Sequence, residues 1–272
     1  MRFEDINWNE MWKQVREDSS LKKLRGLNMS EFWNKRAKRY NESIKYNDRS
    51  DRIISKLDMD SDSTVLDIGA GPGTLAIPLA KRVKSVTAVE PSIGMLECLK
   101  QNAVNDGLTN INYINKKWEE AEVEQHDIVI ASYSLAMEDI QEALSRMNDV
   151  AKKYVYLFTF AGRIFWDYDE IYPKLYGEEY KPGPDYIYLY NLLYSMGIYA
   201  NINITQFEYK QPFSSLDDAV NHSKNNFNMT SSEKDDFLRS YLAKRLEEKD
   251  GKLWAKHESK SAMIWWEKCS IV

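Results

Sequence analysis

The stretch "TVLDIGAGPGTLAIPLA" at residues 64–80 decides the fold. It opens with an apolar run of strand type, continues with Gly69, Gly71 and Gly73 at alternate positions, and ends in an apolar run of helical type. Glycines in this setting let the backbone turn sharply and approach a bound nucleotide closely. The stretch therefore predicts a strand, a nucleotide-binding turn and a helix.

Beyond this stretch, short segments rich in Val, Ile and Leu alternate with helical segments through the middle of the chain. Continuous apolar strands between helices are typical of a parallel sheet covered on both faces. The pattern predicts an α/β fold with a doubly wound sheet. We expect one domain in four parts: N-terminal helices at 1–60, a nucleotide-binding core at 61–160, an aromatic-rich helical insertion at 161–199, and strands and helices at 200–272 that complete the sheet.

Composition narrows the function classes. The 272 residues carry a net charge of −5, which disfavours a nucleic-acid partner. No run approaches the roughly 20 apolar residues of a membrane span, and the N-terminus lacks the apolar core of a signal peptide. We therefore expect a cytoplasmic protein with no membrane partner. Cys98 and Cys269 form no disulfide framework or metal spacing, so we predict no metal.

Two classes of nucleotide compete for the glycine turn. A dinucleotide site has the pattern G-x-G-x-x-G, whose third glycine falls here on Thr74. Asp67, two residues before Gly69, would repel a pyrophosphate but attract a cationic ligand. S-adenosylmethionine bears an ammonium and a sulfonium and no phosphate. The residues therefore favour S-adenosylmethionine over NAD.

Acidic and aromatic residues follow the next two strands. Glu90 ends the strand in "TAVEPS", where a carboxylate accepts hydrogen bonds from both ribose hydroxyls of either nucleotide. Trp118 and Glu119 follow the third strand. Because the carboxyl ends of parallel strands meet at one edge, we predict that these two residues flank the adenine. The alternative for Trp118 is a core aromatic.

Four segments together resemble class I S-adenosylmethionine-dependent methyltransferases, especially their small-molecule branch: "VLDIGAGPGTLAIPLA", "VTAVEPS", "DIVIASYSLAMED" and "FWNKRAKRY". The resemblance implies a seven-stranded, mostly parallel sheet whose last strand, "SAMIWWEK", is antiparallel. It also implies that Asp67, Gly69 and Gly71 line the methionine end of the cofactor. The full set of predicted cofactor contacts is Tyr40, Asp67, Gly69, Ala70, Gly71, Gly73, Glu90, Pro91, Trp118, Glu119, Ser132 and Tyr133.

Within this set, the resemblance puts Ser132 and Tyr133 at the methyl end and Tyr40 on a helix that covers the cofactor. For Tyr40, a core position on an amphipathic helix is an equal alternative. Tyr133, Glu138 and Asp139 lie in "ASYSLAMEDI" after the fourth strand and are the candidate catalytic residues. For Glu138 and Asp139 the alternative is capping of the next helix.

The insertion at 161–199 follows the fifth strand and is rich in tyrosine. Aromatic side chains bind planar and apolar ligands well. We predict that Phe165, Trp166 and Tyr172 wall a pocket for a small, partly apolar acceptor. The alternative is an aromatic layer that only packs on the sheet.

The predicted function is methyl transfer from S-adenosylmethionine to a small-molecule acceptor, with S-adenosylhomocysteine as product. One alternative is methylation of RNA or protein, for which the basic residues Lys35, Arg36, Lys38 and Arg39 are the sole support. Another is a protein that binds S-adenosylmethionine without catalysis. The sequence identifies neither the acceptor nor the oligomeric state.

Overall fold

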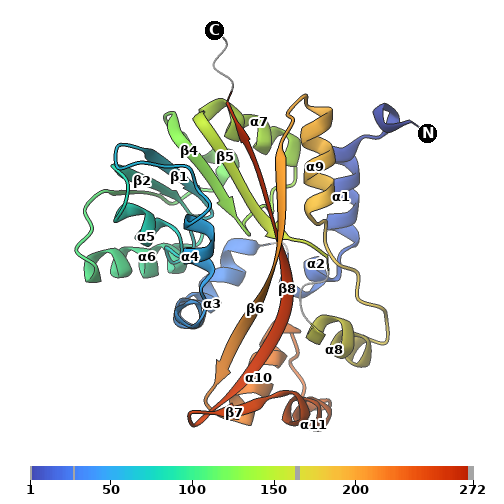
Figure 1. Ribbon diagram of the computed structural model, residues 1–272. Helices are drawn as coiled ribbons and strands as arrows, with labels where there is room; N and C mark the ends of the chain where they lie inside the picture. The colour runs from blue at the N-terminus through green and yellow to red at the C-terminus, as the bar shows by residue number, and fades with distance from the viewer. Residues whose placement is uncertain (1, 27, 163–165, 269–272) are drawn as a thin grey trace.

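The computed structural model describes residues 2–26, 28–162 and 166–268, and Figure 1 shows the course of the chain. Two residues named above, Phe165 and Cys269, lie outside the described residues, as does the side chain of Trp166.

A mixed sheet forms the centre of the molecule. Its path runs β3–β2–β1–β4–β5–β8–β6, and the short β7 pairs with β8 off this path. Strands β1 to β5 pair in parallel, whereas β8 is antiparallel to both β5 and β6. The doubly wound, mostly parallel sheet and its antiparallel last strand are therefore confirmed. The strands are β1 (Thr64–Ile68), β2 (Ser85–Val89), β3 (Ile111–Ile114), β4 (His126–Ser132), β5 (Ala151–Phe160), β6 (Asn201–Phe213), β7 (Glu247–Lys249) and β8 (Lys252–Glu267).

Seven strands were expected, and the main path of the sheet has seven; the short β7 brings the described sheet to eight strands. β7 folds back on β8 through Asp250 and Gly251, which both have positive φ (52° and 69°). Asp-Gly with this backbone is the favoured two-residue hairpin turn. The dipeptide was a readable signal that the sequence analysis did not use.

The helices and 3-10 turns lie before, between and after the strands. They are η1 (Phe3–Asp5), α1 (Trp8–Asp18), α2 (Ser20–Arg25), α3 (Met29–Ser43), η2 (Ile44–Tyr46), α4 (Arg49–Ile54), α5 (Ala76–Ala80), α6 (Ile93–Asn105), η3 (Trp118–Glu120), α7 (Ile140–Val150), α8 (Trp166–Tyr176), α9 (Tyr186–Ser195), α10 (Leu216–Asn226) and α11 (Asp235–Arg245). None of those in the described ranges is both long and apolar enough to cross a membrane.

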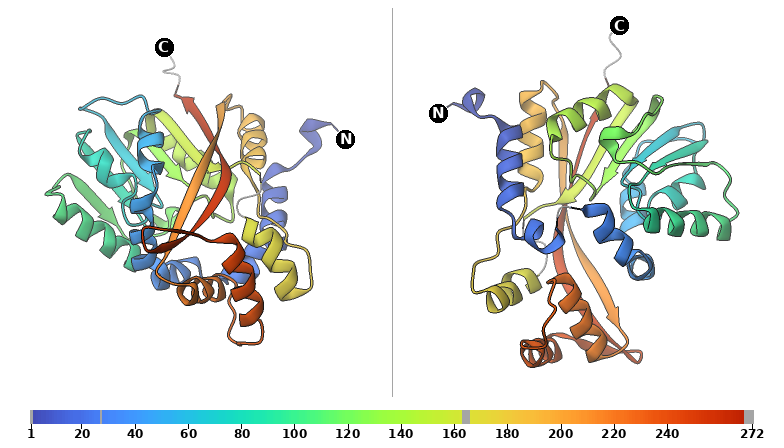
Figure 2. Two further views of the ribbon diagram at one scale, coloured as in Figure 1. Left: turned by 60° about the horizontal axis from the view of Figure 1, so that its bottom comes forward. Right: turned by 180° about the vertical axis from the view of Figure 1, so that it is seen from behind.

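Helices cover both faces of the sheet. On one face α1, α7 and α9 pack through residues such as Trp12 and Leu193, and on the other α4, α5 and α6 pack through residues such as Leu79 and Leu99. α1 and α9 lie side by side although most of the chain's strands come between them in the sequence (Figures 1 and 2). Burying each of these large apolar side chains stabilises the fold by roughly 1.5–3 kcal/mol.

The antiparallel pair of β6 and β8, here called the β6–β8 pair, runs past the end of β5 (Figure 1). β8 pairs with β5 only from Ser261 onward, whereas it pairs with β6 from Leu253 to Trp265. At the end of the β6–β8 pair that lies beyond β5, α8, α10 and α11 enclose a third apolar cluster, which includes Phe213 and Phe227 (Figure 2). Of the 200–272 segment, the strands complete the sheet as expected, while the helices build this separate cluster.

Candidate functional site

The turn between β1 and α5 is a glycine-dependent loop at the carboxyl edge of the sheet. Gly69, Gly71 and Gly73 all have positive φ, at 71°, 56° and 90°. A Cβ on Gly73 would lie 2.3 Å from a side-chain carbon of Leu99, so this glycine permits close packing of the loop on α6. A Cβ on Gly71 would meet no atom within 4 Å. The space in front of Gly71 is therefore open to a ligand.

Two buried carboxylates flank this loop. Asp67 lies in β1 and Glu90 directly follows β2, and each side chain is less than a tenth exposed. Oδ2 of Asp67 has no hydrogen-bond partner. Burial, together with the charge of Glu90, raises the pKa of Asp67 to about 7. An unsatisfied acid beside a second acid is unfavourable in the protein alone and suits a cationic ligand.

Glu90 is held in place by the backbone. Its carboxylate accepts hydrogen bonds from the amide of Gly71 at 2.8 Å and from the amide of Ser92 at 2.7 Å. Burial raises the pKa of Glu90, and these two amides oppose the rise. The carboxylate thus ties the glycine loop to the start of α6. Because each carboxylate oxygen has two acceptor sites, it retains capacity for further donors.

The end of β4 is fastened on both sides. Ser134 donates from Oγ to the carbonyl of Ile68 in β1 at 2.6 Å, and the Tyr133 hydroxyl donates to Oγ of Ser261 in β8 at 2.6 Å. Tyr133 has φ 55°, an unfavourable backbone conformation for a residue with a large side chain. Such strain persists where surrounding contacts fix it, commonly at functional sites.

The comparisons with known proteins agree with this geometry. Residues 65–154, which contain the glycine loop, both acids and the end of β4, match a family model described as a methyltransferase domain. A crystal structure of a Bacillus halodurans protein assigned as a methyltransferase aligns with a TM-score of 0.56, covering 82% of this chain and 99% of that chain. The chain therefore contains a methyltransferase domain at residues 65–154.

Three similar proteins do not identify the acceptor. An uncharacterized protein of Haemophilus influenzae is 34% identical over 213 residues, which is 76% of this chain and 77% of that protein. A Methanosphaera stadtmanae protein assigned as ribosomal RNA small subunit methyltransferase A is 35% identical over 80 residues, 29% of this chain and 30% of that protein. The Bacillus halodurans structure, at 15% identity, shows the fold alone. None of the three defines the acceptor.

Trp118 is a core residue. Its indole is 2% exposed, and its Nε1 donates to the carbonyl of Ala143 in α7 at 3.2 Å. The guanidinium of Arg146 lies 4.5 Å from the ring centroid and donates to the carbonyl of Trp118. These contacts support the core alternative. Glu119 is exposed in η3, and its role at the adenine stays a prediction.

α3 lies over the start of α6, next to the glycine loop. Asn34 Oδ1 accepts hydrogen bonds from Ser92 Oγ at 2.7 Å and from the amide of Gly94 at 3.0 Å. Further along α3, the half-buried Tyr40 accepts a hydrogen bond from Arg49 at 3.1 Å. Tyr40 is thus bonded to Arg49, which was not singled out in the sequence, and its contact with the cofactor stays a prediction.

The remaining predicted cofactor contacts surround the loop. Ala70 is buried and its amide donates to the carbonyl of Val89 at 3.2 Å, which joins the loop to β2. Pro91 follows Glu90 and is half-buried, as is Ser132 at the end of β4. The fold therefore brings Asp67, Gly69, Gly71, Glu90 and Tyr133 to one edge, because β1, β2 and β4 are neighbours in the sheet.

Glu138 and Asp139 are not part of this cluster. Asp139 accepts from the amide of Glu142 at 3.0 Å, which makes it the N-cap of α7. It also accepts a hydrogen bond from the side-chain amide of Asn9 in α1 at 3.1 Å. Asn9 and Asp139 both line a surface hollow of about 450 Å³ whose lining includes neither Asp67 nor Glu90. The Glu142 amide is the main cause of a lowered pKa for Asp139. Glu138 is exposed. The capping alternative therefore holds for Asp139, while a catalytic role for Glu138 stays a prediction.

Tyr172 does not face the cofactor edge. It is 1% exposed in the third apolar cluster, its ring lies 4.7 Å from that of Tyr176, and its hydroxyl donates to Glu178 at 2.7 Å. α9 likewise packs on the sheet through buried leucines. The described part of the insertion therefore acts as a packing layer, which was the alternative given above.

The basic stretch of α3 divides into two halves. Arg39 forms a 2.7 Å ion pair with Asp218, and Arg36 donates to the carbonyl of Asn225 at 2.6 Å. Both arginines thus connect α3 to α10. Lys35 and Lys38 are exposed. Lys35 also forms a 2.9 Å ion pair with Glu31 of α3, so three of the four cations that supported an RNA partner have partners within the protein.

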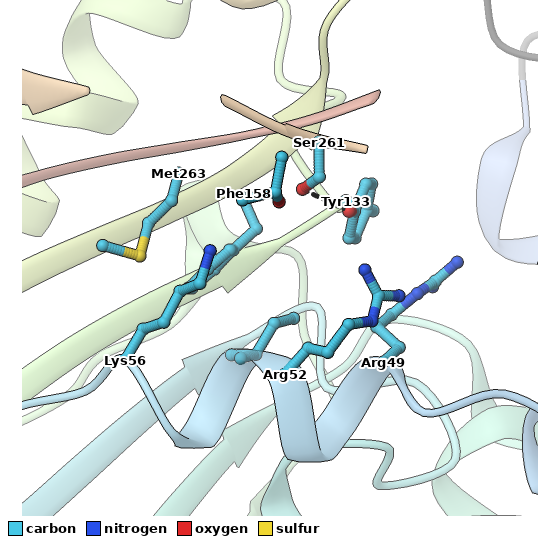
Figure 3. Close-up of a pocket in the computed structure, with 9 residues that line it drawn as sticks. Arg49, Arg52, Lys56, Tyr133, Phe158, Ser261 and Met263 are labelled. Atoms are coloured by element: carbon cyan, nitrogen blue, oxygen red, sulfur yellow. Dashed lines mark hydrogen bonds between the residues drawn. The ribbon is translucent and has the colours of Figure 1, made fainter. Parts of the chain in front are cut away.

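A second group of cations lies close to Tyr133 and was not predicted. Arg49, Arg52 and Lys56 project from α4 and the turn after it toward the strands that carry Tyr133 and Ser261 (Figure 3). Together with Ile53, Phe158, Thr205 and Met263 they line a cavity of about 10 Å³. The sequence signal was present in "DRSDRIISK", but nothing in that segment alone indicates that it faces the end of β4.

Proposed function

We propose that the protein transfers a methyl group from S-adenosylmethionine to a small-molecule acceptor. The observation that carries the proposal is the pair of buried acids beside an open glycine loop. Asp67 Oδ2 is buried without a partner, and the space at Gly71 accepts a Cβ without contact. Both features fit a nucleoside with a cationic end.

The residues have distinct roles in this proposal. Asp67 faces the cationic methionine end, and its ionised form is stabilised by that charge. Glu90 accepts hydrogen bonds from the ribose hydroxyls while the amides of Gly71 and Ser92 hold it in place. When bound, S-adenosylmethionine supplies an electrophilic methyl group on its sulfonium.

Tyr133 borders the position at which the acceptor meets the methyl group. Its hydrogen bond to Ser261 and its contact with Phe160, at 4.6 Å between ring centroids, fix the aromatic ring. A rigid wall of this kind orients an acceptor and excludes water, and orientation alone supplies several kcal/mol of catalysis. A general base is required only if the attacking atom is neutral and bears a proton.

A small acceptor is favoured over RNA by the charges on the surface. The net charge is −5, and Arg36 and Arg39 are engaged within the protein. The match to the ribosomal RNA methyltransferase covers 30% of that protein and does not carry its acceptor over to this chain. Retention on RNA that is lost when Lys35 and Lys38 are both changed to Gln would argue for the RNA alternative.

Calorimetric titration tests the cofactor. We expect S-adenosylmethionine and S-adenosylhomocysteine to bind and NAD not to bind. Glu90→Gln should weaken both by tenfold or more, whereas Glu97→Gln, an exposed residue on α6, serves as the matched control. Binding of NAD without binding of S-adenosylmethionine would overturn the proposal.

Transfer of a labelled methyl group to a metabolite extract tests the reaction. We expect label in the small-molecule fraction. Label confined to the RNA or protein fraction would show that the acceptor is a macromolecule and contradict the proposed small-molecule acceptor. Absence of label in all three fractions, despite cofactor binding, would favour a binding protein without catalysis.

A further inference from the structure

Arg49 is a cation without an acidic partner at the carboxyl edge of the sheet. Nearby cations are engaged: Arg52 forms a 2.8 Å ion pair with Asp48, and Lys56 donates to the side chain of Asn203 at 3.2 Å. Arg49 instead donates to the hydroxyl of Tyr40 at 3.1 Å and lies over the ring of Tyr133. No carboxylate in the described part of the chain lies within 4.0 Å of its guanidinium.

The surroundings of Arg49 favour the charged form of its guanidinium but do not use all of its N–H donors. Burial opposes the charged form, while Tyr40, Tyr133 and Tyr209 act in the opposite direction and the pKa of Arg49 is raised overall. The guanidinium has five N–H donors in a planar fork, and the hydrogen bond to Tyr40 engages one of its nitrogens. A half-buried guanidinium with free donors and no counterion attracts an anion.

Arg49 lies on the acceptor side of the site. Asp67 lies in β1 and Glu90 directly follows β2, and both strands lie on one side of β4 in the sheet order. The cavity beside Arg49 is lined by residues of β5, β6 and β8 on the other side of β4 (Figure 3). Tyr133 at the end of β4 separates the two regions. The site is thus acidic where the cationic cofactor is proposed to bind and basic beyond it.

We propose that the methyl acceptor carries an anionic group, a carboxylate or a phosphate, which Arg49 binds beside Tyr133 and Ser261. This inference rests on the proposed function. The cavity of about 10 Å³ has room for about one water-sized atom, so one oxygen of the anionic group enters it and the rest of the acceptor lies outside. The surface that binds the acceptor is then formed by α4 and the β6–β8 pair, not by the tyrosine-rich insertion.

The first test uses simple anions as probes. Acetate and inorganic phosphate are titrated into the full-length protein, with and without S-adenosylhomocysteine, and binding is followed by nuclear magnetic resonance. We expect at least one probe to bind and Arg49→Gln to weaken it tenfold or more. Arg82→Gln, an exposed arginine after α5, should leave it unchanged. Arg49→Lys keeps the charge and should give an intermediate loss, and thermal melting confirms that each variant is folded.

Three outcomes would overturn the inference. The wild-type protein binds neither probe, or Arg49→Gln binds the probe as well as the wild type does. The third is a loss of S-adenosylhomocysteine affinity in Arg49→Gln equal to the loss of probe affinity, since Arg49 would then bind the carboxylate of the cofactor. Failure of S-adenosylmethionine to bind the wild type would instead reject the proposed function, while the probe titration without cofactor still tests the anion site.

The second test identifies the source of the charge. Products labelled from an extract are separated by anion exchange at neutral pH, with and without prior phosphatase treatment of the extract. Retained product supports the inference. Loss of the acceptor on phosphatase treatment indicates a phosphate, and persistence indicates a carboxylate. A labelled product that is neutral or cationic rejects an anionic acceptor without affecting the proposed methyl transfer.

Discussion

Replacing Asp67 with asparagine should stabilise the protein in the absence of cofactor while weakening cofactor binding. The pKa of Asp67 is raised from 3.8 to about 7 by burial and by the charge of Glu90. Between these two values the folded state holds a proton that the unfolded state has lost. Stability therefore falls as the pH rises from about 4 to about 7 and stays low above that range.

The size of this effect follows from the two pKa values. They differ by about three, and each pKa unit corresponds to about 1.4 kcal/mol, so ionising Asp67 lowers the free energy of unfolding by about 4 kcal/mol at pH 8. An asparagine side chain at this position cannot ionise and avoids this loss. Urea unfolding of Asp67→Asn and the wild type from pH 5 to pH 8.5 measures the difference. Asp62→Asn, an exposed carboxyl in the turn before β1, is the control.

Cofactor binding supplies an independent measurement of the same group. A cationic ligand favours the ionised carboxylate, so binding at pH 7 should release about half a proton from Asp67. Calorimetry in buffers of different ionisation enthalpy measures this number, which should fall toward zero in Asp67→Asn. If the wild type and Asp67→Asn lose stability in parallel across the pH range, the reasoning about a buried, protonated acid is wrong.

Further predictions concern the glycine loop and the aromatic residues. Gly73→Ala should lower the free energy of unfolding by several kcal/mol because its Cβ has no room beside α6, whereas Gly71→Ala should lower it by about 1 kcal/mol and mainly reduce cofactor affinity. Trp118→Phe should lower stability by about 1–2 kcal/mol through its lost hydrogen bond, with less than a threefold change in the Kd of S-adenosylhomocysteine. Tyr172→Ala should lower stability by about 3 kcal/mol or more, with any remaining folded protein keeping the acceptor KM of the wild type.

Each of these pairs a denaturation curve with a binding or kinetic measurement. Equal loss of stability in the two glycine variants would contradict the open space found at Gly71. A large rise in the Kd of S-adenosylhomocysteine for Trp118→Phe, at unchanged stability, would support the predicted contact of Trp118 with the adenine. A selective rise in acceptor KM for Tyr172→Ala, with stability preserved, would restore the insertion as the wall of the acceptor pocket.

The sequence was most informative where neighbouring residues in the chain act together. Gly69, Gly71 and Gly73 adopt the positive φ values that a tight turn requires, and this requirement is local. The alternation of strands and helices predicted the parallel sheet because its strands are apolar on both faces. Sheet order then brought Asp67 and Glu90 together, as expected for adjacent strands.

The tertiary structure decided which side chains outside that loop face the site. Trp118 and Tyr172 are aromatic residues of the kind that often contact ligands. In the folded protein both are buried in apolar clusters formed by segments that are distant in the sequence. Asp139 caps a helix, and two of the basic residues on α3 pair with α10. Aromatic and charged residues serve packing and binding equally well, so the sequence pattern alone does not separate the two uses.

By itself the sequence determined the strand, the glycine turn and the two acids of the proposed cofactor site, because the turn is local and the acids follow or lie in consecutive strands. Only the folded chain placed Arg49 beside Tyr133 and Ser261, which lie far along the chain from it, because α4 and the β5–β8–β6 side of the sheet meet at one cavity. The acceptor side is built from contacts between distant segments, and such contacts leave no periodic signal in the sequence.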